Sequence, residues 1–227
     1  MKLYKFRPLG NDESLNRVAE ILQTGKFWCS RLWEQNDPME GIYTYMTGPN
    51  DAHPLGEVFS AKNRIRICSF SGESALSEKT IWGYYANGFK GVAIEIEIDE
   101  AHVRKVRYKN KPEEWSSAMY GESLVAKVER IVTTKLTSWR NEREYRYLTE
   151  ETKPKQEIGR IKSIFFGEPY RGTQNFQQIH DSTPTLQDYR QLRQRLVSIA
   201  KARGYACFSS GINRSKDGKW SVSHTPI

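Results

Sequence analysis

The chain has 227 residues, enough for one domain with a full apolar core. Hydrophobic residues make up 37% of it and charged residues 27%, an ordinary globular composition that excludes a disordered or fibrous chain. The 35 basic and 27 acidic residues give a net charge of +8, which either keeps the protein soluble or attracts polyanions such as nucleic acid and phosphate-bearing cofactors.

Two further classes are excluded by what the sequence lacks. No stretch approaches the roughly 18 apolar residues of a membrane span, and no apolar signal core follows Met1, so we expect a cytoplasmic protein without a membrane partner. The three cysteines, Cys29, Cys68 and Cys207, are scattered, which argues against a disulfide framework or a zinc site.

The first hundred residues predict alternating strands and helices. The patterns indicate strands over 2–7, 27–30, 64–71 and 91–99, a helix from Asn11 or Asp12 to Gly25, an exposed loop over 47–57, and a helix capped at Ser77. In the strand over 91–99 the apolar residues alternate with Glu95 and Glu97, which predicts one buried and one polar face.

The rest of the chain continues this mixture. We expect strands over 103–108, 144–148, 161–166, 205–209 and 220–223, a mainly helical segment over 112–140, a polar loop over 170–184, and a helix from a Thr185 cap to Gly204 with the buried stripe Leu186, Tyr189, Leu192, Leu196 and Ile199. Strands and helices do not alternate regularly. The sequence therefore predicts a single α+β domain of mixed β-sheets with flanking helices.

Several catalytic signatures are missing from the sequence. It contains no glycine-rich phosphate loop, no Rossmann fingerprint, no nucleophile elbow and no histidine pair at metal spacing. The four histidines lie in four different predicted contexts, which makes a Ser-His-Asp hydrolase improbable and gives no reason to expect a metal.

Two groups of polar residues lie on predicted strands of the first half. Lys5 and Arg7 project from one side of the first strand, where they bind a ligand or only guard a strand edge. Ser69 and Ser71 end a strand that is otherwise apolar, where they orient a nearby group or simply terminate the strand. Three aromatic residues follow this second group, namely Trp82, Tyr84 and Tyr85.

The third group is a pair of carboxylates two residues apart. In an extended chain Glu142 and Glu144 point the same way, and like charges on one face require solvent, a cation such as Arg146, or a functional reason. The alternative interpretation is an exposed strand lip that Arg143 and Arg146 balance.

These groups belong to a wider set of short motifs. They are Leu3-Tyr4-Lys5-Phe6-Arg7, Asn36-Asp37-Pro38-Met39-Glu40, Ile67-Cys68-Ser69-Phe70-Ser71, Trp82-Gly83-Tyr84-Tyr85-Ala86 with Lys90-Gly91-Val92, Trp139-Arg140-Asn141-Glu142-Arg143-Glu144-Tyr145-Arg146 and Ile164-Phe165-Phe166-Gly167. In this order the chain resembles, over about residues 1–167, a bacterial family described only as a domain of unknown function. A C-terminal helix and strands over 185–227 complete the chain. The family supplies no activity.

A second resemblance does supply one. The order of a first-strand basic residue, a Ser-x-Ser strand end and a later Glu-x-Glu is similar to the Arg-Ser-Glu layout of ADP-ribosyltransferases. That resemblance implies an ADP-ribosyltransferase-like fold with NAD as substrate. It assigns the NAD phosphate or ribose to Arg7, with Lys5 as the alternative anchor, and pocket support to Ser69 and Ser71.

The resemblance also assigns the reaction. It implies that Glu144 is catalytic and that Glu142 positions or activates the acceptor. A carboxylate suits this chemistry because breaking the nicotinamide–ribose bond builds positive charge on the ribose. An arginine can hold the pyrophosphate, and an aromatic ring, either Trp82, Tyr84 or Tyr85, can stack on nicotinamide.

Two functional hypotheses follow. The first is an NAD-dependent ADP-ribosyltransferase, a bacterial toxin or phage-defence effector with a nucleic-acid or protein acceptor and a possible antitoxin partner. The second is a non-catalytic nucleic-acid-binding module, suggested by the net charge, the tyrosines available for base stacking and the basic face of the last helix. The four basic residues of that face are Arg190, Arg193, Lys201 and Arg203.

Overall fold

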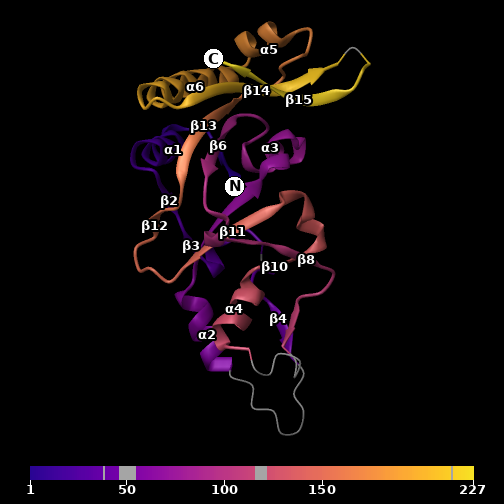
Figure 1. Cartoon of the computed structure of the whole chain (residues 1–227). Coiled ribbons are helices and arrows are strands. Elements are labelled where there is room, and N and C mark those ends of the chain that lie inside the picture. The colour runs from indigo at the N-terminus through magenta and orange to yellow at the C-terminus, as the bar shows by residue number, and fades with distance from the viewer. Residues whose placement is uncertain (38, 46–54, 116–121, 216) are drawn as a thin grey trace. The chain divides into compact units, whose positions relative to one another are not determined.

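A computed structural model describes residues 1–37, 39–45, 55–115, 122–215 and 217–227 (Figure 1). These residues form two compact units. Unit 1 contains Met1–Phe27, Phe70–Asp99 and Glu157–Ile227, and unit 2 contains Trp28–Ser69 and Glu100–Gln156. The chain passes between the units at four points, so no single linker segment separates them in the sequence. Helices and strands are mixed without a regular βαβ repeat, so the predicted α+β class is confirmed.

The sheet of unit 1 is mixed. Its strands follow the hydrogen-bonded order β15 (Trp220–Pro226), β14 (Ala206–Arg214), β13 (Arg160–Gly167), β6 (Gly91–Glu97), β1 (Lys2–Pro8) and β5 (Arg66–Gly72), of which residues 70–72 belong to unit 1. β13 and β14 run parallel, and the other neighbouring pairs within this group are antiparallel. β6 is buried on both faces, so the expected polar face is wrong at Glu95, whose carboxylate accepts a hydrogen bond from the Tyr4 hydroxyl at 3.4 Å.

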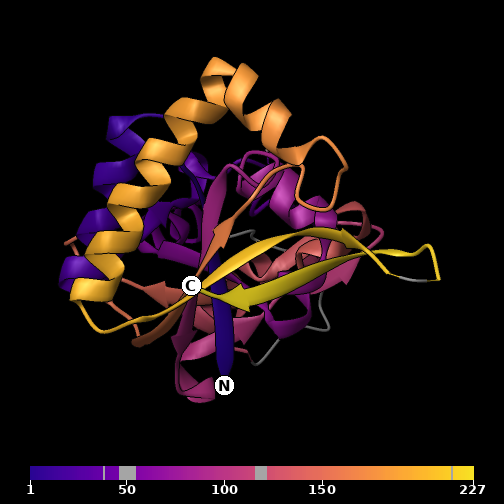
Figure 2. The same ribbon diagram turned by 90° about the horizontal axis from the view of Figure 1, so that it is seen from above.

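Helix α1 (Asp12–Thr24) has the predicted ends. The Asn11 side chain accepts from the Ser14 amide at 2.9 Å, and Gly25 ends the helix with φ of 70°, a left-handed conformation that glycine adopts without steric cost. Figure 2 shows α1 beside α6 (Pro184–Ala202).

Two details of the C-terminal helices differ from the prediction. Helix α6 begins at Pro184 after an N-cap at Thr183, and not after Thr185, because proline lacks the amide hydrogen that the first turn leaves unbonded. Ala200 replaces Ile199 in its buried stripe. The expected loop over 170–184 is wrong in part, since it contains helix α5 (Phe176–Ser182).

An apolar cluster lies on the side of the unit 1 sheet that faces away from α1 and α6. The 3-10 helix η2 (Glu73–Ser77) and helix α3 (Lys79–Tyr85) contribute to a core with Tyr4 and Phe6. The predicted cap at Ser77 is wrong, because the 3-10 turn already uses Ser77 and the helix begins after Glu78.

Unit 2 contains helices α2 (Leu55–Arg64) and α4 (Leu124–Val132) and the 3-10 helices η1 (Leu32–Glu34), η3 (Glu100–His102) and η5 (Thr137–Glu142). Its strands are β3 (Ser30–Arg31), β4 (Tyr43–Tyr45), β7 (Val103–Lys105), β8 (Arg107–Lys109), β9 (Glu113–Trp115), β10 (Thr134–Leu136) and β11 (Glu144–Thr149). β7 pairs antiparallel with β11, and β3 pairs antiparallel with β5. β8 and β10 form a parallel pair, and so do β4 and β9. β2 (Lys26–Trp28) and β12 (Lys155–Glu157) form a further two-stranded sheet.

Unit 2 departs most from the sequence prediction. Residues 55–57 begin a helix and not a loop, while 47–54 lie outside the described residues. The segment over 112–140 contains helix α4 and the start of η5, but strands β9 and β10 interrupt it; its residues 116–121 are outside the described part. These short strands pair with partners remote in sequence, a contact that local periodicity does not reveal. Among the described residues, none of the helices combines the length and apolar character needed to cross a bilayer.

Candidate functional site

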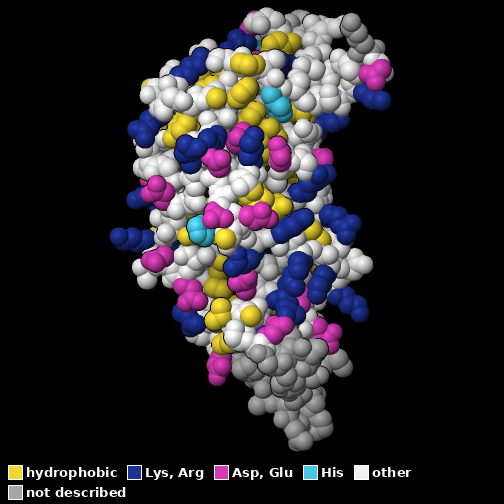
Figure 3. Space-filling view, in the orientation of Figure 1, with side chains coloured by type: hydrophobic (Ala, Val, Ile, Leu, Met, Phe, Trp, Pro, Cys, Tyr) yellow, Lys and Arg dark blue, Asp and Glu magenta, His cyan; other side chains and the backbone are white. Residues whose placement is uncertain are grey.

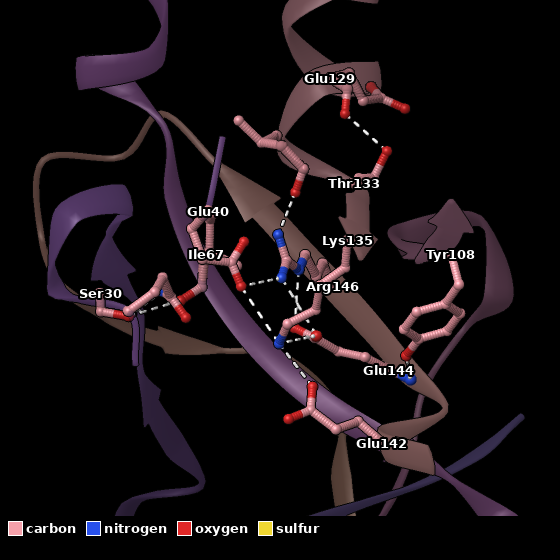
Figure 4. Close-up of polar contacts among 12 residues, drawn as sticks. Ser30, Glu40, Ile67, Tyr108, Glu129, Thr133, Lys135, Glu142, Glu144 and Arg146 are labelled. Atoms are coloured by element: carbon pink, nitrogen blue, oxygen red, sulfur yellow. Dashed lines mark hydrogen bonds and ion pairs between the residues drawn. The ribbon is translucent and has the colours of Figure 1, made fainter. Parts of the chain in front are cut away.

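Five ionisable side chains of unit 2 form a buried network, here named the charge cluster (Figure 4). Its members are Glu40, Lys135, Glu142, Glu144 and Arg146, whose side chains are at most 8% exposed. Three carboxylates face two cations, so the formal charge of the cluster is −1. Buried charges of this kind persist only where they are paired and hydrogen-bonded.

Arg146 is the fully buried centre of the cluster. Its Nε and Nη2 donate to the two carboxylate oxygens of Glu144 at 2.8 and 3.2 Å, a forked arrangement that fixes the plane of that carboxylate. Nη2 also donates to Glu40 Oε1 at 2.7 Å, and Nη1 donates to the carbonyl oxygen of Val132 at the end of α4. The guanidinium therefore joins β11 to two other segments of unit 2.

Lys135 on β10 is the second cation. Its Nζ lies 2.6 Å from Glu142 Oε2, 3.1 Å from Glu144 Oε2 and 3.3 Å from Glu40 Oε1. It also lies 5.0 Å from the centre of the Trp139 ring, a cation–π distance. One ammonium group thus contacts all three carboxylates of the cluster.

The two predicted carboxylates do converge, but not through an extended chain. Glu142 ends the 3-10 helix η5 and Glu144 begins β11, and Arg143 between them is left-handed, with φ of 47°. The alternative of an exposed strand lip is wrong, because the side chains of Glu142, Glu144 and Arg146 are all buried. Arg146 is the cation that the pair was expected to need, and Lys135 is a second one.

The electrostatics favour the charged forms of Glu144, Lys135 and Arg146. Burial disfavours the ionised form of Glu144, but the charges of Arg146 and Lys135 outweigh it and hold the pKa of this carboxyl well below its usual range. Burial likewise opposes the charge of Lys135, yet Glu144, Glu142 and Glu40 raise its pKa above the ordinary value. The two glutamates beside Arg146 raise the pKa of its guanidinium in the same way. Glu144 is therefore an anion at neutral pH.

Tyr108 connects the cluster to strand β8. The Glu144 amide donates to its hydroxyl oxygen at 2.9 Å, and burial raises the pKa of Tyr108 to about 12. This tyrosine therefore stays protonated at neutral pH and fixes the backbone at the start of β11.

The two serines of the Ser-x-Ser motif belong to different units. Ser69 is in unit 2, where its hydroxyl contributes to the low pKa of Glu144, so it lies beside the charge cluster. Ser71 is in unit 1, opposite Tyr4 in the pairing of β1 with β5. Lys5 and Arg7 alternate with Tyr4 along β1 and point to the other face, so Ser71 does not share a face with them. Their roles toward NAD stay predictions.

The three candidate aromatic residues differ in exposure. Trp82 is fully buried, its ring stacks on Phe89 with centroids 4.9 Å apart, and its Nε1 donates to the Leu76 carbonyl oxygen at 2.8 Å. Tyr85 packs against the same core cluster, whereas Tyr84 is 79% exposed. In this conformation Trp82 is a core residue, and Tyr84 is the aromatic most accessible to a ligand.

Sequence reasoning missed Glu40 and Lys135 as members of the site. Glu40 had a signal, since it ends the Asn36–Glu40 motif, but no role followed from that motif alone. Lys135 lies in the segment that was predicted to be helical, and nothing in its neighbourhood marks it as buried. The second carboxylate oxygen of Glu40, Oε2, is buried and has no hydrogen-bond partner among the described residues.

Comparison with known proteins gives no further assignment. No protein-family model matches the chain, and no curated protein and no solved structure matches it significantly. Within the described parts of the chain, no group of three or more His, Cys, Asp and Glu side chains is arranged to hold a metal ion.

Proposed function

We propose that this protein is an NAD-dependent ADP-ribosyltransferase, a glycosyltransferase-class enzyme that acts in the bacterial cytoplasm as a toxin or phage-defence effector. The observation that carries the proposal is the meeting of three sequence motifs in unit 2. Glu40, Ser69 and the Glu142–Arg146 segment are far apart in the chain, yet all contribute to the charge cluster or lie beside it. Motif residues that meet in this way favour one shared site over three unrelated structural roles.

The charge of the cluster suits the proposed reaction. Cleavage of the nicotinamide–ribose bond develops positive charge on the ribose, and a fixed anion stabilises that charge more than it stabilises neutral ground-state sugar. Glu144 is ionised and held by the fork of Arg146, so its charge needs no reorganisation during the reaction. The excess negative charge of the cluster leaves it attractive to a cation despite the two basic residues.

The roles divide between the carboxylates. In this proposal Glu144 stabilises the ribosyl cation and Glu142 positions or activates the acceptor, while Arg146 and Lys135 act on the substrate only through these two residues. Ser69 supports Glu144 from β5. The family resemblance gives Arg7 or Lys5 the dinucleotide phosphates and Tyr84 or Tyr85 the nicotinamide; these residues belong to unit 1, and their roles stay predictions.

The test is nicotinamide release and label transfer from labelled NAD in a cell lysate. We expect Glu144→Gln to lower the rate by about 10²–10³, because it removes one preorganised charge. Circular dichroism and NAD affinity are measured on the same variant, and Glu144→Asp keeps the charge but draws it back by one methylene group. A wild-type rate in a folded Glu144→Gln protein would reject the role of Glu144, and absence of release by the wild-type protein would reject the activity.

A further inference from the structure

A row of basic side chains in unit 2 is not explained by the charge cluster. Residues 104–111 contain five basic residues and no acidic one. Three exposed residues of this segment and one exposed arginine of η5 carry the inference, and we name them the basic strip: Lys105 on β7, Arg107 on β8, Lys111 after β8, and Arg140 in η5. Figure 3 shows Lys and Arg side chains gathered over the part of unit 2 where Figure 1 places β8.

The members of the strip keep their positive charge uncompensated. Arg107 donates to the Arg130 carbonyl oxygen at 2.8 Å and to Thr134 Oγ1 at 3.1 Å, both neutral acceptors. Across the described ranges, no carboxylate forms an ion pair with any of the four side chains. The neighbouring Arg104 and Lys109 do have such partners, Glu129 and Glu113, and are left out of the strip for that reason.

The strip lies next to the charge cluster within the same unit. Tyr108 follows Arg107 directly and binds the Glu144 amide through its hydroxyl. The Thr137 hydroxyl donates to Asn110 Oδ1 at 2.8 Å, which ties η5 to the end of β8. A ligand bound along the strip is therefore beside the backbone that carries Glu144.

Part of the basic charge of the last helix is compensated by carboxylates. Arg190 pairs with Asp181 and Arg195 with Asp12, and Arg193 donates to Ser209 Oγ at 3.0 Å. These bonds hold α6 to its own unit. Arg190, one of the four residues that the sequence pattern emphasised, is therefore already paired within unit 1.

We infer that the basic strip binds the backbone of a single-stranded nucleic acid, and that this nucleic acid is the acceptor of the transferase, a role that rests on the proposed function. A row of cations without interleaved acids matches the evenly repeated charge of phosphates. Half-buried Tyr145 lies opposite Lys105 in the β7–β11 pair, which places an aromatic ring beside a cation, as in surfaces that stack bases.

Fluorescence anisotropy with a labelled single-stranded oligonucleotide of about 16 nucleotides, without NAD, tests the surface. Four phosphate contacts predict a slope of about −3 for log affinity against log salt, or about 50-fold weaker binding between 50 and 200 mM salt. The variant K105Q/K111Q/R140Q should bind at least about tenfold more weakly, with a slope near −1. The matched control K2Q/K26Q/K153Q removes the same charge from exposed lysines elsewhere and should bind like the wild-type protein.

The outcomes separate this inference from the proposed function. Absence of oligonucleotide binding, equal losses in the two triple variants, or equally tight binding of polyglutamate would overturn the strip as a nucleic-acid surface. Nicotinamide release is measured with cell lysate as the source of acceptors and without added oligonucleotide, so its absence rejects the transferase activity while leaving the binding result intact. Label transfer to the oligonucleotide by the wild-type protein, lost in the strip variant, supports both.

Discussion

The interiors of the two units are stabilised by different interactions. Around Trp82 in unit 1, buried side chains are mostly aromatic or aliphatic, and the hydrophobic effect alone favours their burial. In unit 2, next to an apolar cluster of its own, Arg146 is equally buried but depends on Glu144 and Glu40 to offset its desolvation. Removing one partner of a buried ion pair leaves the other charge unpaired, which costs about 3–5 kcal/mol, whereas an exposed contact of unit 1 is lost at a much smaller cost.

The largest expected effect comes from breaking the network at its centre. Arg146→Met keeps much of the volume but leaves Glu144 and Glu40 without their shared cation, and should cost about 3–5 kcal/mol of unfolding free energy. The matched control is Arg160→Met, since Arg160 pairs with Glu97 at 2.9 Å on the surface, where an ion pair is worth at most about 1 kcal/mol. Urea denaturation of both variants measures the difference.

A compensating variant distinguishes lost charge balance from lost packing. Arg146→Met combined with Glu144→Leu returns the cluster to a formal charge of −1 and should recover most of the stability lost in the single variant. A double variant no more stable than Arg146→Met would mean that packing, and not ion pairing, explains the loss.

The pH dependence of the unfolding free energy should also distinguish the buried ion pairs of unit 2 from the exposed pairs of unit 1, with an effect of intermediate size. The pKa of Glu144 falls from 4.5 to about 2 on folding, so its stabilisation is complete above pH 4.5 and is lost as the pH falls toward 2. Unfolding free energies measured over this range should decline less steeply in Glu144→Gln. Glu97 has a similarly low pKa because Arg160 and Lys162 bind it, but that exposed contribution is screened by salt. An acid dependence abolished by salt would assign it to surface pairs instead.

The smallest effect concerns a local feature of unit 1. Asn11→Ala removes the side-chain acceptor for the Ser14 amide at the start of α1 and should cost about 1 kcal/mol. Thermal unfolding measures this cost, and Asn11→Asp, which retains the acceptor, should stay close to wild type. A loss as large as that of Arg146→Met would contradict the view that unit 1 absorbs single changes.

The same contrast explains how much could be predicted from sequence. Asn11 and Gly25 mark the ends of α1 by local chemistry, and the helix is where they indicate. The α+β class followed from such local signals. In unit 2 the partners of Arg146 include a residue 106 positions away, and Lys135 lies in a strand whose partner is not its neighbour in sequence. Glu142 and Glu144 were found by their spacing, while the cations and the third carboxylate required the tertiary structure.

The left-handed residue between the two glutamates has a consequence for recognising similar sites in other chains. In a straight strand, Glu-x-Glu places both side chains on one face. Here a 3-10 helix and a strand meet at Arg143, and the positive φ of Arg143 lets both carboxylates accept hydrogen bonds from Lys135. Proline cannot adopt this conformation, and β-branched residues adopt it only with strain. The middle position of the Glu-x-Glu motif must therefore hold a residue that can adopt a positive φ. Another chain with the same spacing of glutamates can form this site only if its middle residue meets that condition.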